Sequence, residues 1–375
     1  MSTACYRRLP WSVVAIAVLL TAVGCMGIAR AEELAGGSGR ILHRQIVFVL
    51  VAAAAAVAMA VPHYRVLGRY SYAAYFGTLV LLGAVFLFPP VNFAHRWIWV
   101  GPLSLQPSEL AKVATVLALA RYLMHRDDHR RPVGLLVPLA IALVPVALIL
   151  PEPDLGTALV FPPVFFAMLY AAGARGRHLL GMIIVGLLLV PLLWAQMSPQ
   201  QRGRVTAFFD QPSAADRPGD EGYHLYRANQ VRALGGTWGS WITGQPTDDP
   251  AVYRLPHAQS DFLFAVLGER FGLPGMGLVL GLYALLVARI LAVAAATREP
   301  FGRLVAAGIA ALFAIEAFIN TGMTVGLLPI TGLSLPLMSA GGSGLLAHAA
   351  ALGLVVNIAM RPGYEVAPEP FRYRG

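Results

Sequence analysis

The stretch "HLLGMIIVGLLLVPLLWAQM", residues 178–197, contains no acidic residue, no lysine and no arginine. A run of ~20 apolar residues has the length that a helix needs to cross the hydrocarbon core of a bilayer. Similar runs occur over residues 11–29, 45–61, 72–89, 107–124, 133–150, 155–172, 272–293, 302–322 and 343–360. The sequence therefore predicts an all-α polytopic membrane protein with about ten transmembrane helices.

The composition agrees with a chain embedded in a membrane. Of the 375 residues, 57% are hydrophobic and 13% are charged, whereas soluble domains average about 25% charged residues. The net charge is +9, and all basic residues except one are arginines, most of them in short loops between apolar runs. This placement favours membrane topology over nucleic-acid binding as the reason for the charge. The two cysteines provide neither a disulfide framework nor a metal-binding spacing.

The arginines also predict the orientation of the chain. With the N-terminus inside, the inner segments hold sixteen arginines and the short outer loops hold four, as the positive-inside rule requires. Both termini are then cytoplasmic, and a long loop over 198–271 faces outward within a single transmembrane domain, 1–375. A signal peptide is the alternative for the first run, because "ARA" at 29–31 resembles a cleavage site. That run is longer than the usual signal core of about 7–15 residues, which favours a retained helix.

Two outer segments have unusual patterns. In "LYRANQVRALGGTWGSWI" (225–242), apolar side chains recur every three residues from Leu225 to Leu234 and two tryptophans follow, which predicts an amphipathic segment on the membrane surface. The segment 323–344 carries no charge but several glycines and prolines. Irregular backbone at membrane depth persists only where it is buried in protein or lines a cavity. We expect a re-entrant or broken outer segment there, with an ordinary apolar loop as the alternative.

Lys112 is the only lysine in the chain. It lies in "QPSELAK" (106–112), at the predicted outer end of a membrane helix whose first turn suits Pro107. Glu109 is three residues away and shares a helix face with Lys112. Because ionisable groups at membrane depth are usually functional, we expect both to take part in the activity. A plain ion pair at a helix start is the alternative.

Four other ionisable residues are candidates. In "RLPHAQSDFLFAV" (254–266), Asp261 stands directly before an apolar run, at the outer lip of the bilayer, where it could act as a general base or cap a helix. Helix capping also explains Asp154. Arg96 suits either an aromatic belt or phosphate binding. Glu316 lies inside an apolar run and must pair, protonate or face a polar cavity.

Four motifs occur together along the chain. They are "RWIWVGPLSLQPSELAK" (96–112), "PDLGTALVF" (153–161), "SDFLFAVLGERFG" (260–272) and "FINTGMTVGLLPITGLSLPLMSAGGSG" (318–344). In order and spacing they resemble the SEDS family, the RodA and FtsW proteins of bacterial wall synthesis, over nearly the whole chain. The chain length and the stretch "GYHLYRANQ" are closer to RodA than to FtsW.

The resemblance implies an activity and its location. Family members have ten membrane helices and polymerise lipid II on the outer face of the bacterial cytoplasmic membrane, for cell elongation and shape or for division. Their partner is a class B penicillin-binding protein, a transpeptidase. The proposed catalytic aspartate of the family matches Asp261, and its functional glutamate and lysine match Glu109 and Lys112.

Three positions depart from the family pattern. His257 stands where the family usually has an acid, and Gln259 stands where it usually has a histidine. In "SAGGS", Ala340 replaces the usual tyrosine. The acid that usually flanks the catalytic aspartate is therefore missing here, while Asp261 itself is matched.

The expected chemistry is a single inverting displacement, because lipid II carries its sugar on an α-pyrophosphate and the strand linkage is β. Asp261 would remove the proton from the 4-hydroxyl of the acceptor, and cations, among them Lys112, would surround the leaving pyrophosphate. The expected substrate-binding residues are Arg96, Arg202, Arg204, Asp154, Ser339 and Ser343. No cofactor is certain. A divalent cation, Mg²⁺ or Mn²⁺, could assist, although no cluster of acids forms a dedicated metal cage.

Two other functional classes stay open at this point. A transporter that flips lipid II would also have a broken helix and charges within the membrane. A scaffold would only hold the partner transpeptidase. Asp261 separates these classes from an enzyme, because a flippase has little need of a base at the outer mouth.

Overall fold

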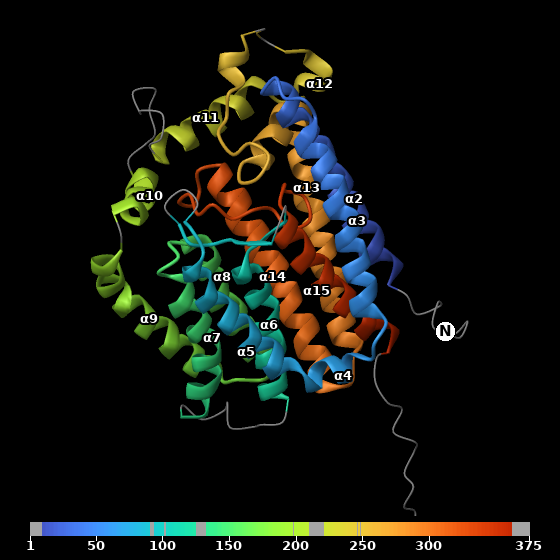
Figure 1. Ribbon diagram of the computed structural model, residues 1–375, viewed down its shortest axis with the longest axis vertical. Coiled ribbons are helices and arrows are strands. Elements are labelled where there is room, and N and C mark those ends of the chain that lie inside the picture. Colours follow the sequence, from blue (N-terminus) through green and yellow to red (C-terminus); the bar gives the residue numbers. More distant parts are fainter. Residues whose placement is uncertain are drawn as a thin grey trace, which may run out of the picture.

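The structure is a computed structural model that describes residues 10–90, 94–100, 103–124, 133–197, 199–209, 221–245, 247 and 249–361. This part of the chain forms a helical bundle with one antiparallel pair of short strands (Figure 1). The α-helices are α2 (Trp11–Leu34), α3 (Arg40–Ala60), α4 (Tyr64–Arg69), α5 (Ser71–Ala84), α6 (Pro107–Leu123), α7 (Leu136–Ile149), α8 (Leu155–Ala171), α9 (Gly176–Gln196), α10 (Pro199–Phe209), α11 (Glu221–Leu234), α12 (Ser240–Thr243), α13 (Leu263–Ala296), α14 (Pro300–Thr324) and α15 (Gly342–Met360). The shorter elements are η1 (Val85–Leu87), β1 (Ile98–Val100), β2 (Leu103–Leu105), η3 (Val133–Leu135) and η4 (Pro250–Tyr253).

Each predicted apolar run coincides with a helix. In the described part of the chain, α2, α3, α9, α13, α14 and α15 are long and apolar enough to cross a membrane, and three shorter apolar segments accompany them. The chain is thus an all-α multi-pass membrane protein, as predicted. The number of crossings and their direction remain predictions. The strands β1 and β2 were not expected, and they add only a small hairpin before α6.

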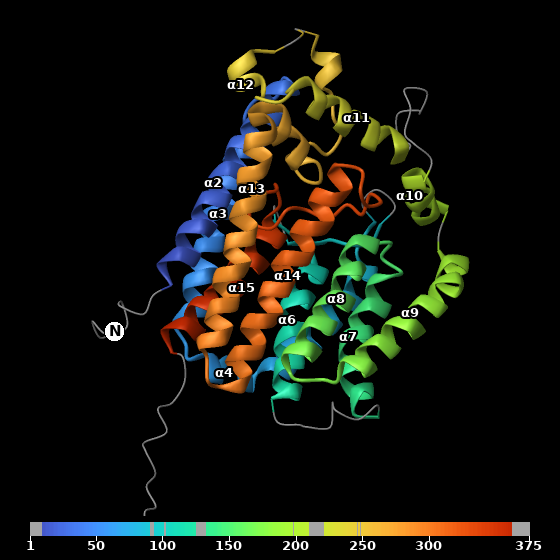
Figure 2. The same cartoon turned by 180° about the vertical axis from the view of Figure 1, so that it is seen from behind.

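Two helices form the centre of the bundle. α6 packs against α5, α7, α8, α14 and α15, and almost all of its residues are buried. α14 packs against α6, α8, α13 and α15. In contrast, α9 and α10 lie along one edge of the molecule in both views (Figures 1 and 2). Glu109 and Lys112 of α6 and Glu316 of α14 are therefore buried inside the bundle.

The first helix is an integral part of this bundle. Leu20 and Ile28 of α2 are completely buried. A side chain at Gly24 would come within 2.5 Å of the backbone of Met338, so α2 touches the irregular segment between α14 and α15 directly. α2 thus packs as part of the bundle, and its retention in the protein stays a prediction.

The segment 198–271 is more ordered than a long loop. It contains α10, α11, α12 and the first turns of α13, which begins at Leu263 rather than at the predicted residue 272. Gly272 interrupts the helix with φ = 63°. A side chain there would meet the carbonyl oxygen of Thr237 at 2.3 Å, so the kink depends on glycine because the two backbones approach so closely.

The prediction that α11 lies on the membrane surface with its apolar stripe is wrong in one respect. Leu225, Ala228 and Val231 are buried in a cluster with Phe262 and other residues of the protein. The stripe therefore packs onto α13 and the segment before it. Trp238 and Trp241, which follow the stripe, are exposed.

Residues 325–341 between α14 and α15 are irregular and largely buried, as the glycines and prolines predicted. Tyr283 Oη donates a hydrogen bond to the carbonyl of Pro336 at 2.6 Å, and Asn320 Nδ2 donates to that of Leu333 at 2.6 Å. Side chains from α13 and α14 thus satisfy polar backbone groups that no regular element pairs. Whether the segment re-enters the membrane remains a prediction.

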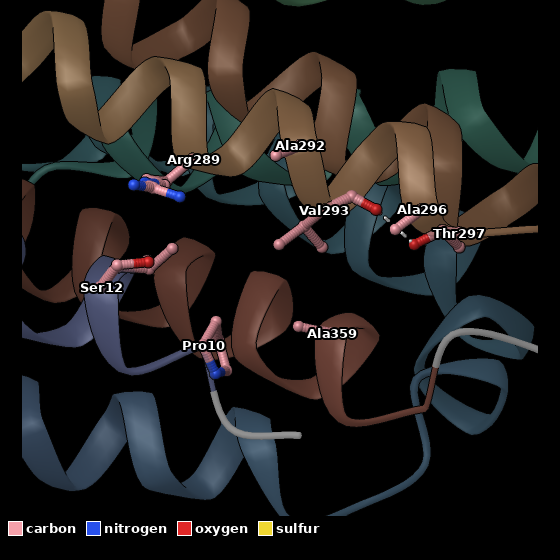
Figure 3. A pocket seen from close by; sticks show the side chains of 9 residues that line it. Pro10, Ser12, Arg289, Ala292, Val293, Ala296, Thr297 and Ala359 are labelled. Carbon is pink, nitrogen blue, oxygen red and sulfur yellow. Dashed lines mark hydrogen bonds between the residues drawn. The ribbon is translucent and has the colours of Figure 1, made fainter. Parts of the chain in front are cut away.

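A hollow of ≈ 450 Å³ lies at the far end of α13 from Asp261. It is bordered by the start of α2 and the ends of α13 and α15, with Arg289 and Ser12 on opposite sides (Figure 3). Thr297 on its rim donates a hydrogen bond to the carbonyl of Val293 at 2.7 Å. This hollow is lined by none of the candidate residues Asp261, Glu109 and Lys112.

Candidate active site

Asp261 is presented by a tight turn immediately before α13. The carbonyl oxygen of His257 accepts hydrogen bonds from the N–H groups of Ser260, Asp261 and Phe262, at 3.1, 3.1 and 3.2 Å. The first helical residue is Leu263, and the cap residue Phe262 makes no side-chain capping bond. Asp261 therefore does not cap α13, and the alternative that explained it by capping loses its basis.

The irregular segment and α14 hold this turn by its backbone. Ser339 Oγ donates to the carbonyl of Ser260 at 2.5 Å, and the N–H of Ala340 donates to that of Gln259 at 2.8 Å. Asn320 Nδ2 donates to the carbonyl of Asp261 at 2.9 Å. The backbone carbonyls of residues 259–261 are thus fixed, and none of these three hydrogen bonds uses the carboxylate of Asp261.

A glycine lets a cation approach Asp261. A side chain at Gly332 would lie 3.6 Å from Asp261 Oδ2 and 3.8 Å from Arg204 Nη1. Both groups therefore face the same small space above the backbone of Gly332, whose φ of 73° also favours glycine. Arg204 Nη1 also contacts the carbonyl of Thr331 at 3.5 Å. The guanidinium of α10 is in this way placed beside the carboxylate.

The surroundings alter the basicity of Asp261. Burial raises its pKa above the ordinary value, while the charges of His257, Arg204 and Arg96 and the hydroxyl of Ser260 lower it. The raising effect is the largest, because a carboxylate that loses water loses most of its solvation. A carboxylate with a raised pKa accepts a proton more readily than an ordinary aspartate does.

Lys112 lies in a fully buried cluster of charged side chains. Its Nζ donates to Glu109 Oε1 at 2.9 Å and also to Glu316 Oε1. Glu316 Oε2 is in turn hydrogen-bonded to His348 Nε2 at 2.5 Å. None of the four residues is more than 6% exposed. Glu316, which the sequence required to pair, protonate or face a cavity, is paired with a cation from α6 and an imidazole from α15.

α14 connects this cluster to Asp261. Asn320, which holds the carbonyl of Asp261, follows Glu316 by four residues on the same helix. Four residues advance about 6 Å along the helix axis and return to nearly the same face. Glu316 therefore lies about one helical turn along α14 from the residue that holds the backbone of Asp261.

Arg96 joins the hairpin to the loop between α7 and α8. Its Nε donates to the carbonyl of Glu152 at 3.0 Å, and a second guanidinium nitrogen donates to that of Pro153. The side chain of Glu152 is completely buried, and neither carboxyl oxygen has a hydrogen-bond partner among the described residues. Burial, reinforced by the charge of Asp154, raises the pKa of Glu152 to about 8 despite the opposing charge of Arg96.

The sequence and the fold both match known proteins. The family model of the FtsW/RodA/SpoVE cell cycle proteins matches residues 7–363. The chain belongs to this family. A probable peptidoglycan glycosyltransferase FtsW from Trichlorobacter lovleyi is 34% identical over 333 residues, which cover 87% of this chain and 85% of the relative. A probable peptidoglycan glycosyltransferase FtsW from Alkalilimnicola ehrlichii is 35% identical over 369 residues, which cover 94% of this chain and 90% of the relative.

Two solved structures are similar over nearly the whole length. The rod shape determining protein RodA of Thermus thermophilus has a TM-score of 0.70 and 30% identity, covering 93% of this chain and 96% of that one. A chain from a study of polymerization and crosslinking by a peptidoglycan synthase complex has a TM-score of 0.77 and 32% identity, covering 93% and 97%. The relatives matched by sequence are named FtsW, whereas the named structure is a RodA.

Two of the three departures from the family motifs lie at positions where only the backbone is used. Gln259 contributes its carbonyl and Ala340 its N–H to the bond that fixes the Asp261 turn. Substitutions at these two positions leave that bond intact because it involves no side-chain atom. His257 has a positive φ of 55°, and its ring lies 6.2 Å from that of His224, edge to face.

A metal ion does not fit the buried cluster. Among the described residues, the one group of His, Cys, Asp and Glu side chains close enough to share an ion is Glu109, Glu316 and His348. Lys112 already bonds to both carboxylates, so its ammonium takes the place where a cation would sit.

The other predicted substrate-binding residues have structural partners. Asp154 is the cap of α8, accepting from the N–H of Thr157 at 3.3 Å, and also accepts from Gln106 Nε2 at 3.0 Å. Ser339 holds the Asp261 turn. Ser343 donates to the carbonyl of Ser104 at 2.9 Å. The structure thus gives Asp154 the capping role that the sequence offered as an alternative, and gives both serines a role in positioning.

Arg202 is directed toward α9. Its guanidinium donates to the carbonyls of Trp194 and Ala195, at 3.2 and 2.8 Å. These bonds satisfy carbonyls at the end of a helix. The structure therefore brings Arg204, but not Arg202, to the carboxylate of Asp261.

Sequence reasoning missed two residues of this region. Glu152 directly precedes the "PDLGTALVF" motif, but no pattern singles it out, and His348 falls within an apolar run. A histidine in a membrane helix is itself an indication of function or pairing. Its partner could not be found from the sequence, because Glu316 and His348 lie 32 residues apart on different helices.

Proposed function

We propose that this chain, a peptidoglycan glycosyltransferase of the FtsW/RodA family, polymerises lipid II with Asp261 as the general base. The observation that carries the proposal is the carboxylate of Asp261. Three hydrogen bonds to backbone carbonyls hold its turn, it does not cap α13, and it faces the space above Gly332 together with Arg204. A transporter or a scaffold has no need of such a group.

The chemistry follows from this arrangement. Asp261 takes the proton from the 4-hydroxyl of the acceptor sugar, and the oxygen attacks the anomeric carbon of the donor. The bond from that carbon to the pyrophosphate breaks, and the lipid pyrophosphate leaves with the electron pair. Attack from the opposite face converts the α-linked donor into a β-linked strand. Arg204 and Arg96 stabilise the charge that develops on the leaving group.

Glu109 and Lys112 support the reaction from inside the helical bundle. Their side chains are buried, so the charges of this ion pair contribute to the electrostatic field of the site. Ion pairs in a region of low dielectric act over longer distances than in water. This proposal predicts that both residues are needed for turnover.

The location and the partner follow from the same assignment. The structure with the higher TM-score comes from a study of a peptidoglycan synthase complex that couples polymerization to crosslinking. We assign this chain to the bacterial cytoplasmic membrane with its active site outward, and a class B penicillin-binding protein as the transpeptidase partner. The ten crossings, the cytoplasmic termini and the re-entrant outer segment belong to this proposal.

The chain length and the "GYHLYRANQ" stretch favour a role in cell elongation. The FtsW names of the sequence relatives favour division instead. Complementation distinguishes the two. We expect the gene to restore rod shape to cells depleted of RodA, and rescue of FtsW-depleted cells alone would assign it to division.

The substitution Asp261→Asn tests the proposed reaction. It preserves size and shape but removes the charge and the basicity. We expect a folded protein whose rate of glycan synthesis from lipid II falls by about 10²–10⁴-fold, the usual contribution of general-base catalysis. Asp261→Glu should give an intermediate rate, because the carboxylate is kept but displaced by one methylene group.

Two controls accompany this measurement. Asp249→Asn changes an exposed aspartate of the same outer segment and should leave the rate unchanged. Thermal stability and co-purification with the transpeptidase establish that the variants are folded. Full activity of a folded Asp261→Asn protein would remove Asp261 from the mechanism and favour the flippase or the scaffold.

A further inference from the structure

Four buried side chains form a linear chain of hydrogen bonds across three helices. Glu109 and Lys112 come from α6, Glu316 from α14 and His348 from α15. The order of contact is Glu109 Oε1 to Lys112 Nζ, Lys112 Nζ to Glu316 Oε1, and Glu316 Oε2 to His348 Nε2. Lys112 thus stands between two carboxylates, and only one of them is fixed at its far end.

Both carboxylates bond to the ammonium of Lys112, but only Glu316 has a second side-chain partner. A buried charge is stable only when it is paired and its remaining hydrogen-bonding groups are satisfied. Glu316 meets this requirement through Lys112 on one oxygen and His348 on the other. An ionised carboxylate can only accept, so His348 Nε2 must be the donor and carry the hydrogen. The pair Glu316 and His348 therefore forms a fixed anchor for one side of Lys112.

The carboxylate at the other end of the chain has one oxygen without a partner among the described residues. Glu109 uses Oε1 for Lys112, while its Oε2 is buried without a hydrogen-bond partner among the described residues. This oxygen faces α15 at Gly344, where a side chain would come within 3.2 Å of it. Ser334 Oγ lies 3.8 Å from the same point. A side chain at position 344 would crowd Oε2, so glycine there leaves this oxygen room, beside the irregular segment that holds the Asp261 turn.

We propose that Glu316 and His348 are positioning residues that hold the Lys112 ammonium on Glu109 Oε1, so that Glu109 Oε2 remains free to accept a hydrogen bond from a hydroxyl or amide N–H group of the lipid-linked sugar. The proposal rests on the glycosyltransferase function given above. Without the anchor, Lys112 has Glu109 as its only carboxylate and can bond to both of its oxygens. The free acceptor is then lost.

The single lysine of this chain allows a direct test that does not depend on activity. Lysine labelled with ¹³C at Cε and ¹⁵N at Nζ places one side-chain NMR probe in the whole protein, at Lys112. We expect Glu316→Gln and His348→Leu to shift this signal, because each removes part of the anchor. His348→Gln should leave it near its original position, since the Nε2 of glutamine can donate where the imidazole did.

The rate of glycan synthesis should fall in the same variants that shift the NMR signal of Lys112. We expect Glu316→Gln and His348→Leu to lower kcat for glycan synthesis from lipid II by about 10-fold or more, the scale of a small misplacement in an active site. His348→Gln should stay within about 3-fold of the unsubstituted protein. The matched control is Glu299→Gln, the same exchange at the cap of the same helix. Glu299 caps α14 through the N–H of Gly302 at 2.7 Å, so its loss should change neither the signal nor kcat.

Three results would overturn the proposal. One is a Glu316→Gln protein with full activity and an unchanged lysine signal. Another is a folded His348→Gln protein that is inactive while its lysine signal is unchanged, because His348 would then transfer a proton itself. If Glu316→Gln fails to fold, equal behaviour of His348→Gln and His348→Leu refutes the anchor. An unsubstituted protein that makes no glycan refutes the proposed function, whereas the lysine signal still decides the anchor.

Discussion

At the scale of single residues, the site separates two kinds of acid. Asp261 is half-buried, held through backbone carbonyls and close to a guanidinium, so its carboxylate is free for chemistry. Asp154 accepts hydrogen bonds from Thr157 and Gln106, so its carboxylate is used by the fold. The same residue type at the start of two helices therefore has different roles. What decides the role is whether nearby N–H and O–H groups already occupy the carboxylate.

The substitution Lys112→Arg tests whether a compact ammonium is required. The guanidinium keeps the charge, but it is larger and planar, and the cavity between Glu109 and Glu316 is closed by buried neighbours. We expect the rate of glycan synthesis to fall by about 10- to 100-fold. Arg121→Lys makes the opposite exchange at the other end of α6 and should be neutral. Near-normal activity of Lys112→Arg would favour the plain ion pair.

Glu152 predicts a change of stability with pH. Its pKa is about 8 in the folded protein, whereas the ordinary value for a glutamate, which applies to the unfolded chain, is 4.5. The folded state therefore binds the proton more tightly, and the resulting stabilisation is complete below pH 4.5 and is lost as the pH rises through 8. Each unit of pKa corresponds to about 1.4 kcal/mol, so the loss is on the order of a few kcal/mol.

The substitution Glu152→Gln should remove this dependence, because glutamine stays neutral. We expect the Tm of the variant, relative to the unsubstituted protein, to be clearly higher at pH 8.5 than at pH 5. Thermal unfolding in detergent at the two pH values measures this difference. An equal difference at both values would mean that Glu152 is already ionised in the folded state at pH 5.

At the scale of the elements, close approach between a helix and irregular backbone shapes the site. A side chain at Gly156 of α8 would lie 2.5 Å from the carbonyl oxygen of Thr331. Thr331 precedes Gly332, above which Asp261 and Arg204 meet. The position of α8 is thus transmitted to the carboxylate through a single stretch of backbone.

Gly156→Ala should therefore destabilise the protein by about 1–3 kcal/mol, the cost of forcing an extra carbon into a packed contact. It should also lower the rate of glycan synthesis, because the backbone beside Gly332 must move. Gly181→Ala on α9 is the matched control, since a side chain there meets nothing within 4 Å. That change should leave the rate unaltered and stabilise α9 by up to about 1 kcal/mol. Equal Tm values for the two variants would contradict the close contact.

At the scale of the whole molecule, the candidate site lies at one end of the bundle. Asp261 precedes the start of α13, whereas the hollow beside Arg289 lies near its end (Figure 3). α11 and α12 cover the end that carries Asp261, and α4 lies at the opposite end (Figures 1 and 2). This polarity agrees with the orientation that the arginines predict, in which the end with Asp261 faces outward.

Protease protection tests this orientation. Tags placed after Arg130 and after Gly375 should resist protease added to intact spheroplasts, while a tag near Asp220 should be cut. Residues 130, 220 and 375 lie outside the described part of the chain, so the prediction depends on the arginine counts alone. Protection of the tag near Asp220 would place the active site inside and invalidate the proposed function.

The sequence alone determined the fold class and the positions of the apolar helices, and it selected Asp261, Glu109 and Lys112 as candidates. These features are local, because hydrophobic length and short motifs do not depend on distant contacts. The tertiary structure decided that α11 packs on protein, that α13 begins before Gly272, and that Glu316 bonds to both Lys112 and His348. Lys112 and Glu316 lie 204 residues apart. Which buried charges meet depends on how all the helices pack together, and no local pattern of apolar residues contains that information.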